Sequence, residues 1–98
     1  MARFDVYKTE NGEYLVDCQA DLLSYMETRF AVPLIPPDRG LKVIQKLNPT
    51  FAIEGETFIF FAQYASAVSI RSLKEKIISL DKYDSVILGA LDMLISGY

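Results

Sequence analysis

The chain of 98 residues contains no histidine, no tryptophan and a single cysteine. Without histidine it lacks the most common general acid–base group, the most common metal ligand and the base of every Ser–His or Cys–His nucleophile pair. The lone Cys18 cannot form a disulfide within the chain, which suits a reducing compartment, and we interpret it as a small buried apolar residue. No calcium-loop spacing of acids around a glycine is visible. We therefore expect no metal and no cofactor.

Long apolar runs and glycine-rich loops are also missing. The longest apolar runs, Phe58–Ala62 and Val86–Leu91, are far shorter than the roughly 20 residues that span a bilayer. The five glycines are isolated, which excludes a phosphate-binding loop and a dinucleotide fingerprint. The first residues pass directly into an alternating pattern, without the apolar stretch of a secretory signal. We expect a cytoplasmic protein that has no contact with a membrane.

The charge balance is mildly acidic, with a formal net charge of -3 and a pI near 4.8. The ten basic residues are scattered, and the nearest approach to a cluster, Arg71–Lys76, is interrupted by Glu75 and is typical of a solvated face. This balance disfavours direct binding of nucleic acid, because phosphate binding draws its affinity from clustered Lys and Arg. Hydrophobic residues make up 51% of the chain. So much apolar material in a small domain predicts that some of it faces a partner, most simply in a homodimer.

Alternating apolar residues predict strands at Arg3–Lys8 and Glu13–Ala20. Between them, Asn11-Gly12 tolerates the positive φ angles that a type I′ hairpin turn requires, so the chain opens with an antiparallel hairpin. A third strand is predicted over Arg29–Ile35, and Pro33, which donates no backbone hydrogen bond, places it at an edge or a bulge.

A second antiparallel unit follows the loop at Pro36–Gly40. Its predicted strands are Thr50–Glu54, Thr57–Ala62 and Tyr64–Arg71, with a tight Glu54-Gly55 turn after the first of them. The segment Ser72–Lys82 fits a short helical turn or the end of a strand, and no assignment is made.

The last segment changes to a helical period. Apolar residues recur at three-and-four spacing from Val86 to Ile95, Asp84 is a plausible N-cap, and Gly97 occupies the position of a left-handed C′ residue. Gly89 in mid-helix indicates close contact with another backbone. With no repeat or linker, residues 1–98 are predicted to form a single mostly β (α+β) domain.

Two carboxylates offer the only hint of acid–base chemistry. Asp17 and Asp21 lie four residues apart, which on a strand places both on one face. The alternative is a pair of ordinary solvated carboxylates.

The order of segments resembles the CcdB toxins of bacterial toxin–antitoxin pairs along essentially the whole chain. The matching segments are Arg3-Phe4-Asp5-Val6-Tyr7, the stretch from Tyr14 to Leu23, Val32-Pro33-Leu34, Leu47-Asn48-Pro49, Ile53-Glu54-Gly55-Glu56, the stretch from Ala65 to Ile70, and the closing stretch from Ala90 to Tyr98. No single motif is specific, and the co-linear set carries the resemblance. It implies a small CcdB/MazF-like antiparallel β-barrel or sheet with a three-stranded wing and one C-terminal helix.

The resemblance also implies a mechanism without catalysis. A toxin homodimer, whose C-terminal helices lie near the two-fold axis, enters the open gate of the DNA gyrase A subunit and traps the enzyme on cleaved DNA. A cognate antitoxin binds the dimer and releases the target. Nucleic acid would be contacted only indirectly, through the antitoxin or gyrase.

Target contacts in the family come chiefly from the last three residues, a tryptophan, a glycine and an isoleucine. Here these positions hold Ser96, Gly97 and Tyr98, so only the glycine is kept. We hypothesise that Tyr98 supplies the planar surface that the tryptophan offers to an arginine of the target. The alternative is a frayed terminus whose tyrosine rests on its own dimer mate. The positions that match supporting contacts are Arg3, Phe4, Ala20, Leu22 and Asp92, of which Phe4 and Leu22 also fit packing positions.

Three functions stay open on these grounds. The first is a gyrase poison, with topoisomerase IV as a related target. The second is a degenerate homologue that keeps antitoxin binding but has lost the poison activity. The third is a ribonuclease toxin of the same fold, against which the missing histidines and the acidic pI count.

Overall fold

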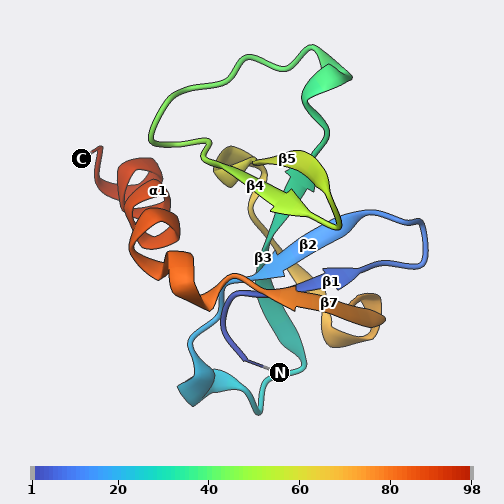
Figure 1. Ribbon diagram of the computed structural model, residues 1–98. Helices are drawn as coiled ribbons and strands as arrows, with labels where there is room; N and C mark the ends of the chain where they lie inside the picture. The colour runs from blue at the N-terminus through green and yellow to red at the C-terminus, as the bar shows by residue number, and fades with distance from the viewer. Residues whose placement is uncertain (1, 98) are drawn as a thin grey trace.

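The computed structural model describes residues 2–97, and its strands form one antiparallel sheet (Figure 1). The strands are β1 (Asp5–Lys8), β2 (Tyr14–Asp17), β3 (Thr28–Ile35), β4 (Thr50–Ile53), β5 (Glu56–Phe60), β6 (Ser66–Ser69) and β7 (Glu75–Ser79). Their order is β4-β5-β3-β2-β1-β7, with β6 paired to β3 outside this path. Short 3-10 turns connect them: η1 (Asp21–Leu23), η2 (Pro37–Arg39), η3 (Ala62–Tyr64), η4 (Ile70–Ser72) and η5 (Asp81–Tyr83). The single α-helix of the described residues, α1, covers Asp84–Ser96. A mostly β fold with a C-terminal helix is confirmed.

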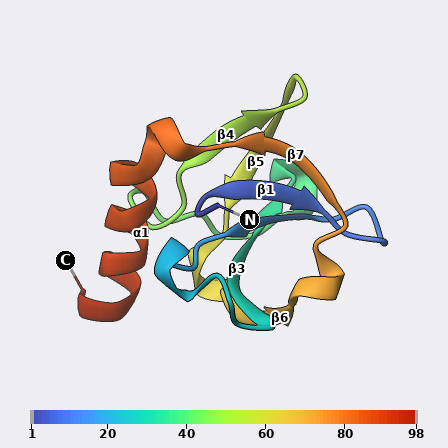
Figure 2. The same ribbon diagram turned by 90° about the horizontal axis from the view of Figure 1, so that it is seen from below.

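The sheet curls because β3 changes partners along its length. One edge of β3 pairs with β2, whereas the other pairs with β6 from Thr28 to Ala31 and with β5 only at Leu34 and Ile35. The hairpin β4–β5 therefore attaches to the rest of the sheet through the last two residues of β3. Figure 2 shows the resulting curve of the strands, with β6 and β4 turned toward opposite sides.

Pro33 lies where β3 passes from one partner to the other. Of the two positions predicted from Pro33, an edge or a bulge, the edge is wrong, since β3 has neighbours on both sides. The Pro33 carbonyl accepts a hydrogen bond from Phe61 N at 3.0 Å, just after β5 ends. At this gap no ladder partner requires the N–H that proline lacks.

The two tight turns differ from each other in type. At the first hairpin only Gly12 has a positive φ, 83°. Its N–H donates to Thr9 O, and Thr9 N donates to Glu13 O. The predicted type I′ turn at Asn11-Gly12, which requires two positive φ angles, is therefore wrong. A three-residue loop with a left-handed glycine replaces it. Both residues of the predicted Glu54-Gly55 turn have positive φ, 52° and 82°, which is the type I′ signature.

The unassigned segment between Ser72 and Lys82 contains β7, which pairs with β1. The 3-10 turn η5 then runs straight into α1. Asp84 is consequently not the N-cap: it already has helical angles, φ -55° and ψ -42°, and Tyr83 holds the cap position. The C-terminal prediction is confirmed, because Gly97 is left-handed and its N–H bonds Met93 O at 2.9 Å.

The main core lies between one face of the sheet and α1, which flanks the sheet in both views (Figures 1 and 2). Ile87, Ala90 and Leu91 are the buried residues of the helix. They pack in one cluster with strand residues that include Val6, Val16, Val32, Ile53 and Phe60. No helix among residues 2–97 is both long enough and apolar enough to span a membrane.

Candidate target-binding surface

The end of α1 is solvent-exposed. Asp92, Ser96 and Gly97 are all exposed, as the family resemblance requires of contact residues. The left-handed Gly97, at φ 81°, ends the helix and turns the chain out of the helical path. Tyr98, the proposed aromatic contact, lies outside the described residues.

Only a narrow stripe of α1 is buried, so the helix presents much apolar surface to solvent. Ile95 is 76% exposed, and three further residues are more than a third exposed: Val86, Leu88 and Leu94. Gly89 is also exposed, and apart from its chain neighbours and the backbone of α1 itself no atom of residues 2–97 lies within 4 Å of a Cβ built on it. The close backbone contact predicted from Gly89 is therefore not made within the described part of the protomer.

The N-terminal residues divide between surface and core. Phe4 is fully buried and has a strained positive φ of 73°. Its backbone is held on both sides, by Asp17 O and by Leu80 N. The Arg3 guanidinium lies over the Phe4 ring, 4.6 Å from its centroid. Because Phe4 is buried, it packs in the core of the protomer. It can affect a partner only indirectly, by holding the Arg3 guanidinium in place.

Ala20 and Leu22 belong to the segment of residues 20–27, here called the β2–β3 loop. Leu22 is 87% exposed, so the packing alternative for this residue is wrong. The same loop also exposes Leu23, Tyr25 and Met26, with Tyr25 at 80%. Sequence reasoning missed these three, although a run of apolar residues without alternation between two strands was a visible signal. Such a cluster of exposed apolar side chains in a soluble chain indicates a contact surface.

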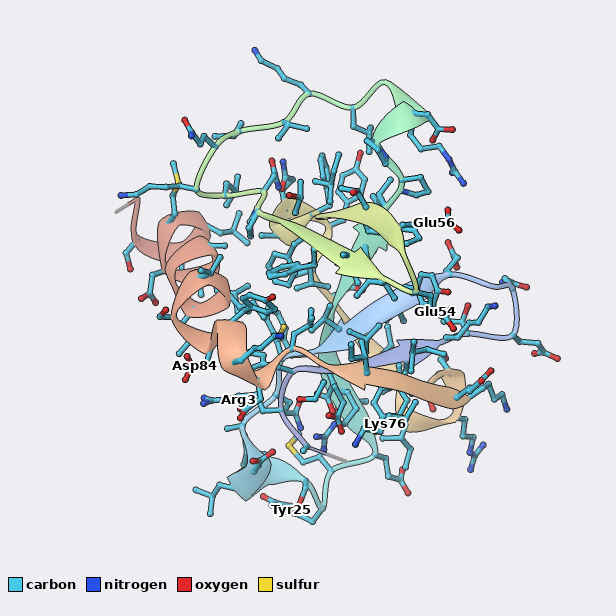
Figure 3. The ribbon with its side chains drawn as sticks, viewed as in Figure 1. Arg3, Tyr25, Glu54, Glu56, Lys76 and Asp84 are labelled. Atoms are coloured by element: carbon cyan, nitrogen blue, oxygen red, sulfur yellow. The ribbon has the colours of Figure 1, made fainter. Side chains whose placement is uncertain are left out.

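The predicted contact residues form two separate groups. Figure 1 places the end of α1 at the upper left and η1, in cyan, at the lower left, so the tip of the helix and the β2–β3 loop lie apart within one protomer. Arg3 belongs with the loop, since its backbone N–H donates to Asp21 Oδ1 at 2.7 Å. Figure 3 draws Arg3 between Asp84, at the start of α1, and Tyr25 of the loop.

A buried ion pair lies beneath the β2–β3 loop. Arg29 Nε donates to Asp17 Oδ2 at 3.0 Å, Nη2 lies 2.8 Å from the same oxygen, and both side chains have 0% exposure. Within residues 2–97, neither Nη1 nor Nη2 has an acceptor in hydrogen-bonding geometry. Burial raises the pKa of the neighbouring Tyr7, and the charges of Asp5 and Asp17 add to the shift. The burial of Arg29 was not predictable from the residues around it.

This arrangement contradicts the acid–base interpretation of Asp17 and Asp21 and, for Asp17 alone, the interpretation as a solvated carboxylate. Asp17 is neither solvated nor free, because Arg29 neutralises it in the interior. Asp21 is exposed and holds the Arg3 backbone instead. The two carboxylates therefore do not form an acid–base pair.

Among residues 2–97, no cluster of His, Cys, Asp or Glu could hold a metal ion. Cys18 packs partly buried against the core, and burial, together with the charge of Asp17, raises the pKa of its thiol. A hydrogen bond that Tyr14 donates to Glu54 raises the pKa of the Tyr14 phenol to about 12. Tyr14 also lines an open groove of about 640 Å³ together with Phe58, Tyr64 and Arg39.

Fold and surface together define a small antiparallel β-domain that exposes apolar side chains at its C-terminal helix and at one interstrand loop. The chain belongs to the CcdB family: the model of that family, described as CcdB protein, matches residues 3–97. No curated protein matches the chain. Membership of the family supports a toxin of a toxin–antitoxin pair, in a family of gyrase-binding proteins that are not known as enzymes.

Proposed function

We propose that this chain is a single-domain cytoplasmic toxin that binds and poisons DNA gyrase as a homodimer, catalyses no reaction, and is neutralised by a cognate antitoxin. The observation that carries the proposal is the family match over residues 3–97, on a structure whose C-terminal helix exposes apolar side chains. Nucleic acid takes part only through gyrase or the antitoxin, which agrees with the net charge of -3.

The outward side of α1 supports the homodimer. Leu88 and Ile95, which lie seven residues apart on one flank of the helix, would gain burial against a second copy, at about 25 cal/mol per Å² of apolar surface removed from water. Gly89 lacks a side chain on this side and therefore lets a second backbone approach closely. A C₂ arrangement buries the same patch on both protomers.

Sedimentation of the Gly89→Leu variant tests the dimer. The protomer has room for the added side chain, so we expect a folded chain that dissociates at concentrations where the wild type is dimeric. Ala67→Leu, at an exposed position of β6, adds similar bulk away from the helix and should leave the dimer intact. A wild type that sediments as a monomer at micromolar concentration refutes the homodimer.

The direction of the chain at Gly97 supports the target-binding tail. Gly97 ends the helix in a left-handed conformation, so the chain leaves the helical path next to the exposed Ser96. In this proposal the Tyr98 ring stacks on an arginine of the gyrase A subunit, in place of the family's tryptophan.

Growth of cells that express the chain tests the target. We expect growth arrest with accumulated gyrase–DNA cleavage complexes. Tyr98→Ala should abolish arrest by weakening the complex by about 2 kcal/mol, whereas Tyr98→Phe keeps the aromatic face and should remain toxic. Unchanged toxicity of Tyr98→Ala removes Tyr98 from the mechanism. Normal growth with retained antitoxin binding identifies a degenerate homologue, and cleavage of RNA by the purified chain identifies a ribonuclease.

A further inference from the structure

The β2–β3 loop has little structure of its own to keep its shape. It contains the single 3-10 turn η1, held by bonds from Leu23 N to Ala20 O at 2.9 Å and from Ser24 N to Asp21 O at 3.0 Å. Its apolar side chains hold it only in part, since Leu22 and Tyr25 are 87% and 80% exposed, whereas Leu23 and Met26 are 37% and 38% exposed. Because none of these four side chains is fully buried, the loop depends largely on polar anchors for its order.

The carboxamide of Gln19 is the main anchor of this loop. Its Nε2 donates to Leu23 O at 3.2 Å, inside the loop, and to Thr28 O at 3.1 Å, at the start of β3. Its Oε1 accepts from Phe30 N at 3.0 Å. One side chain thus connects the middle of the loop to the strand that follows it.

The buried ion pair in turn holds Gln19. Asp17 Oδ1 accepts a hydrogen bond from Gln19 N at 3.1 Å, while Asp17 Oδ2 is occupied by Arg29. Because Asp17 ends β2 and Arg29 lies in β3, the pair fastens the two strands together where the loop leaves them. The far end of the loop is tied to η4, through Ile70 N and Glu27 O at 2.9 Å.

We propose that Gln19, held by the Asp17–Arg29 pair, is a positioning residue that orders the β2–β3 loop so that Leu22 and Tyr25 project from the surface before a target arrives. This inference rests on the proposed gyrase-binding function. A loop ordered in advance loses less conformational freedom on binding, so positioning raises affinity without any contact between Gln19 and the target. Figure 3 shows Tyr25 at the outer end of the loop, directed away from the sheet.

Amide hydrogen exchange of the Gln19→Met variant tests the positioning directly. Methionine keeps the length of the side chain and removes its hydrogen bonds, so the fold should survive. We expect exchange in residues 20–27 to become about tenfold faster, with α1 unchanged. The matched control is Gln63→Met, which removes another partly buried carboxamide, bonded to Asn48. The control should leave the β2–β3 loop unchanged, and equal exchange in this loop for Gln19→Met and the wild type overturns the inference.

Affinity for the gyrase A subunit distinguishes a positioning residue from one that only stabilises the fold. We expect Gln19→Met to weaken binding about tenfold, equivalent to about 1.4 kcal/mol, and Gln63→Met to change it less than about twofold. In a Leu22→Ala, Tyr25→Ala background the loop has lost its contacts, so Gln19→Met should then have almost no further effect.

The outcomes separate the inference from the proposed function. Full tenfold weakening that persists in the Leu22→Ala, Tyr25→Ala background overturns the positioning role, as does unchanged affinity of Gln19→Met. A wild type that does not bind the gyrase A subunit refutes the proposed function instead. In that case the exchange comparison still decides whether Gln19 orders the loop.

Discussion

Replacement of Asp17 by Asn should destabilise the chain strongly. The substitution keeps the side-chain volume and an oxygen for Gln19 N, but leaves the Arg29 guanidinium charged in a site where both side chains have 0% exposure. Removal of one partner of a buried ion pair costs about 3–5 kcal/mol, because the remaining charge has no compensation. A domain of this size has only about 5–15 kcal/mol of stability, so the midpoint of thermal unfolding should fall by more than about 10 °C.

Urea denaturation measures this cost, at a fixed protein concentration because self-association would add to the apparent stability. Arg29→Met should destabilise by a similar amount, since it leaves the carboxylate of Asp17 unpaired. In the double variant both charges are gone, together with the two Arg29 nitrogens that lack acceptors. The double variant should therefore lose at least about 2 kcal/mol less free energy of unfolding than the two single variants lose in sum. A cost of less than about 1 kcal/mol for Asp17→Asn, or additive losses in the double variant, would refute the reasoning.

Three further predictions concern single side chains. The pKa of Tyr14 is about 12 in the folded chain and about 10 when unfolded, so its contribution to stability is complete below about pH 10 and is lost as the pH rises through 12. In the Tyr14→Phe variant the free energy of unfolding should fall less steeply as the pH rises from about 10 to about 12. An unchanged pH dependence in this variant contradicts the raised pKa of Tyr14. Because burial raises the pKa of the Cys18 thiol, thiol reagents at pH 8 should label it at least about 100-fold more slowly than in urea; rapid labelling of the folded chain would show an open site. Gly97→Ala, at φ 81°, should lower stability by about 1 kcal/mol, whereas the neighbouring Ser96→Ala should not, and equal unfolding midpoints would count against a strained helix end.

Local features of the fold were predictable from the sequence. The Glu54-Gly55 turn, the helix that ends before Gly97 and the approximate positions of most strands follow from neighbouring residues alone. A glycine at a left-handed position and apolar residues at a fixed period act within a few residues of each other.

Features that depend on strand partners were not predictable. Asn11-Gly12 fits a type I′ turn locally, but the register between β1 and β2, with Lys8 opposite Tyr14, leaves room for a longer loop. The segment after Ser72 has no strong period of its own and becomes β7 only because the exposed edge of β1 is available to it. Pro33 indicated that one backbone hydrogen bond of β3 is missing. The structure places this position in the gap between the residues of β3 that pair with β6 and those that pair with β5.

The sequence by itself determined the family resemblance, the scarcity of catalytic chemistry and the exposed helix end at Asp92, Ser96 and Gly97. The tertiary structure decided which polar groups are buried, because pairing of β2 with β3 brings Asp17 and Arg29 together across 12 residues of chain. It also decided that Gln19 anchors the β2–β3 loop. A carboxamide in a sequence has no preferred partner, and its role depends on which backbone groups the folded chain leaves within reach.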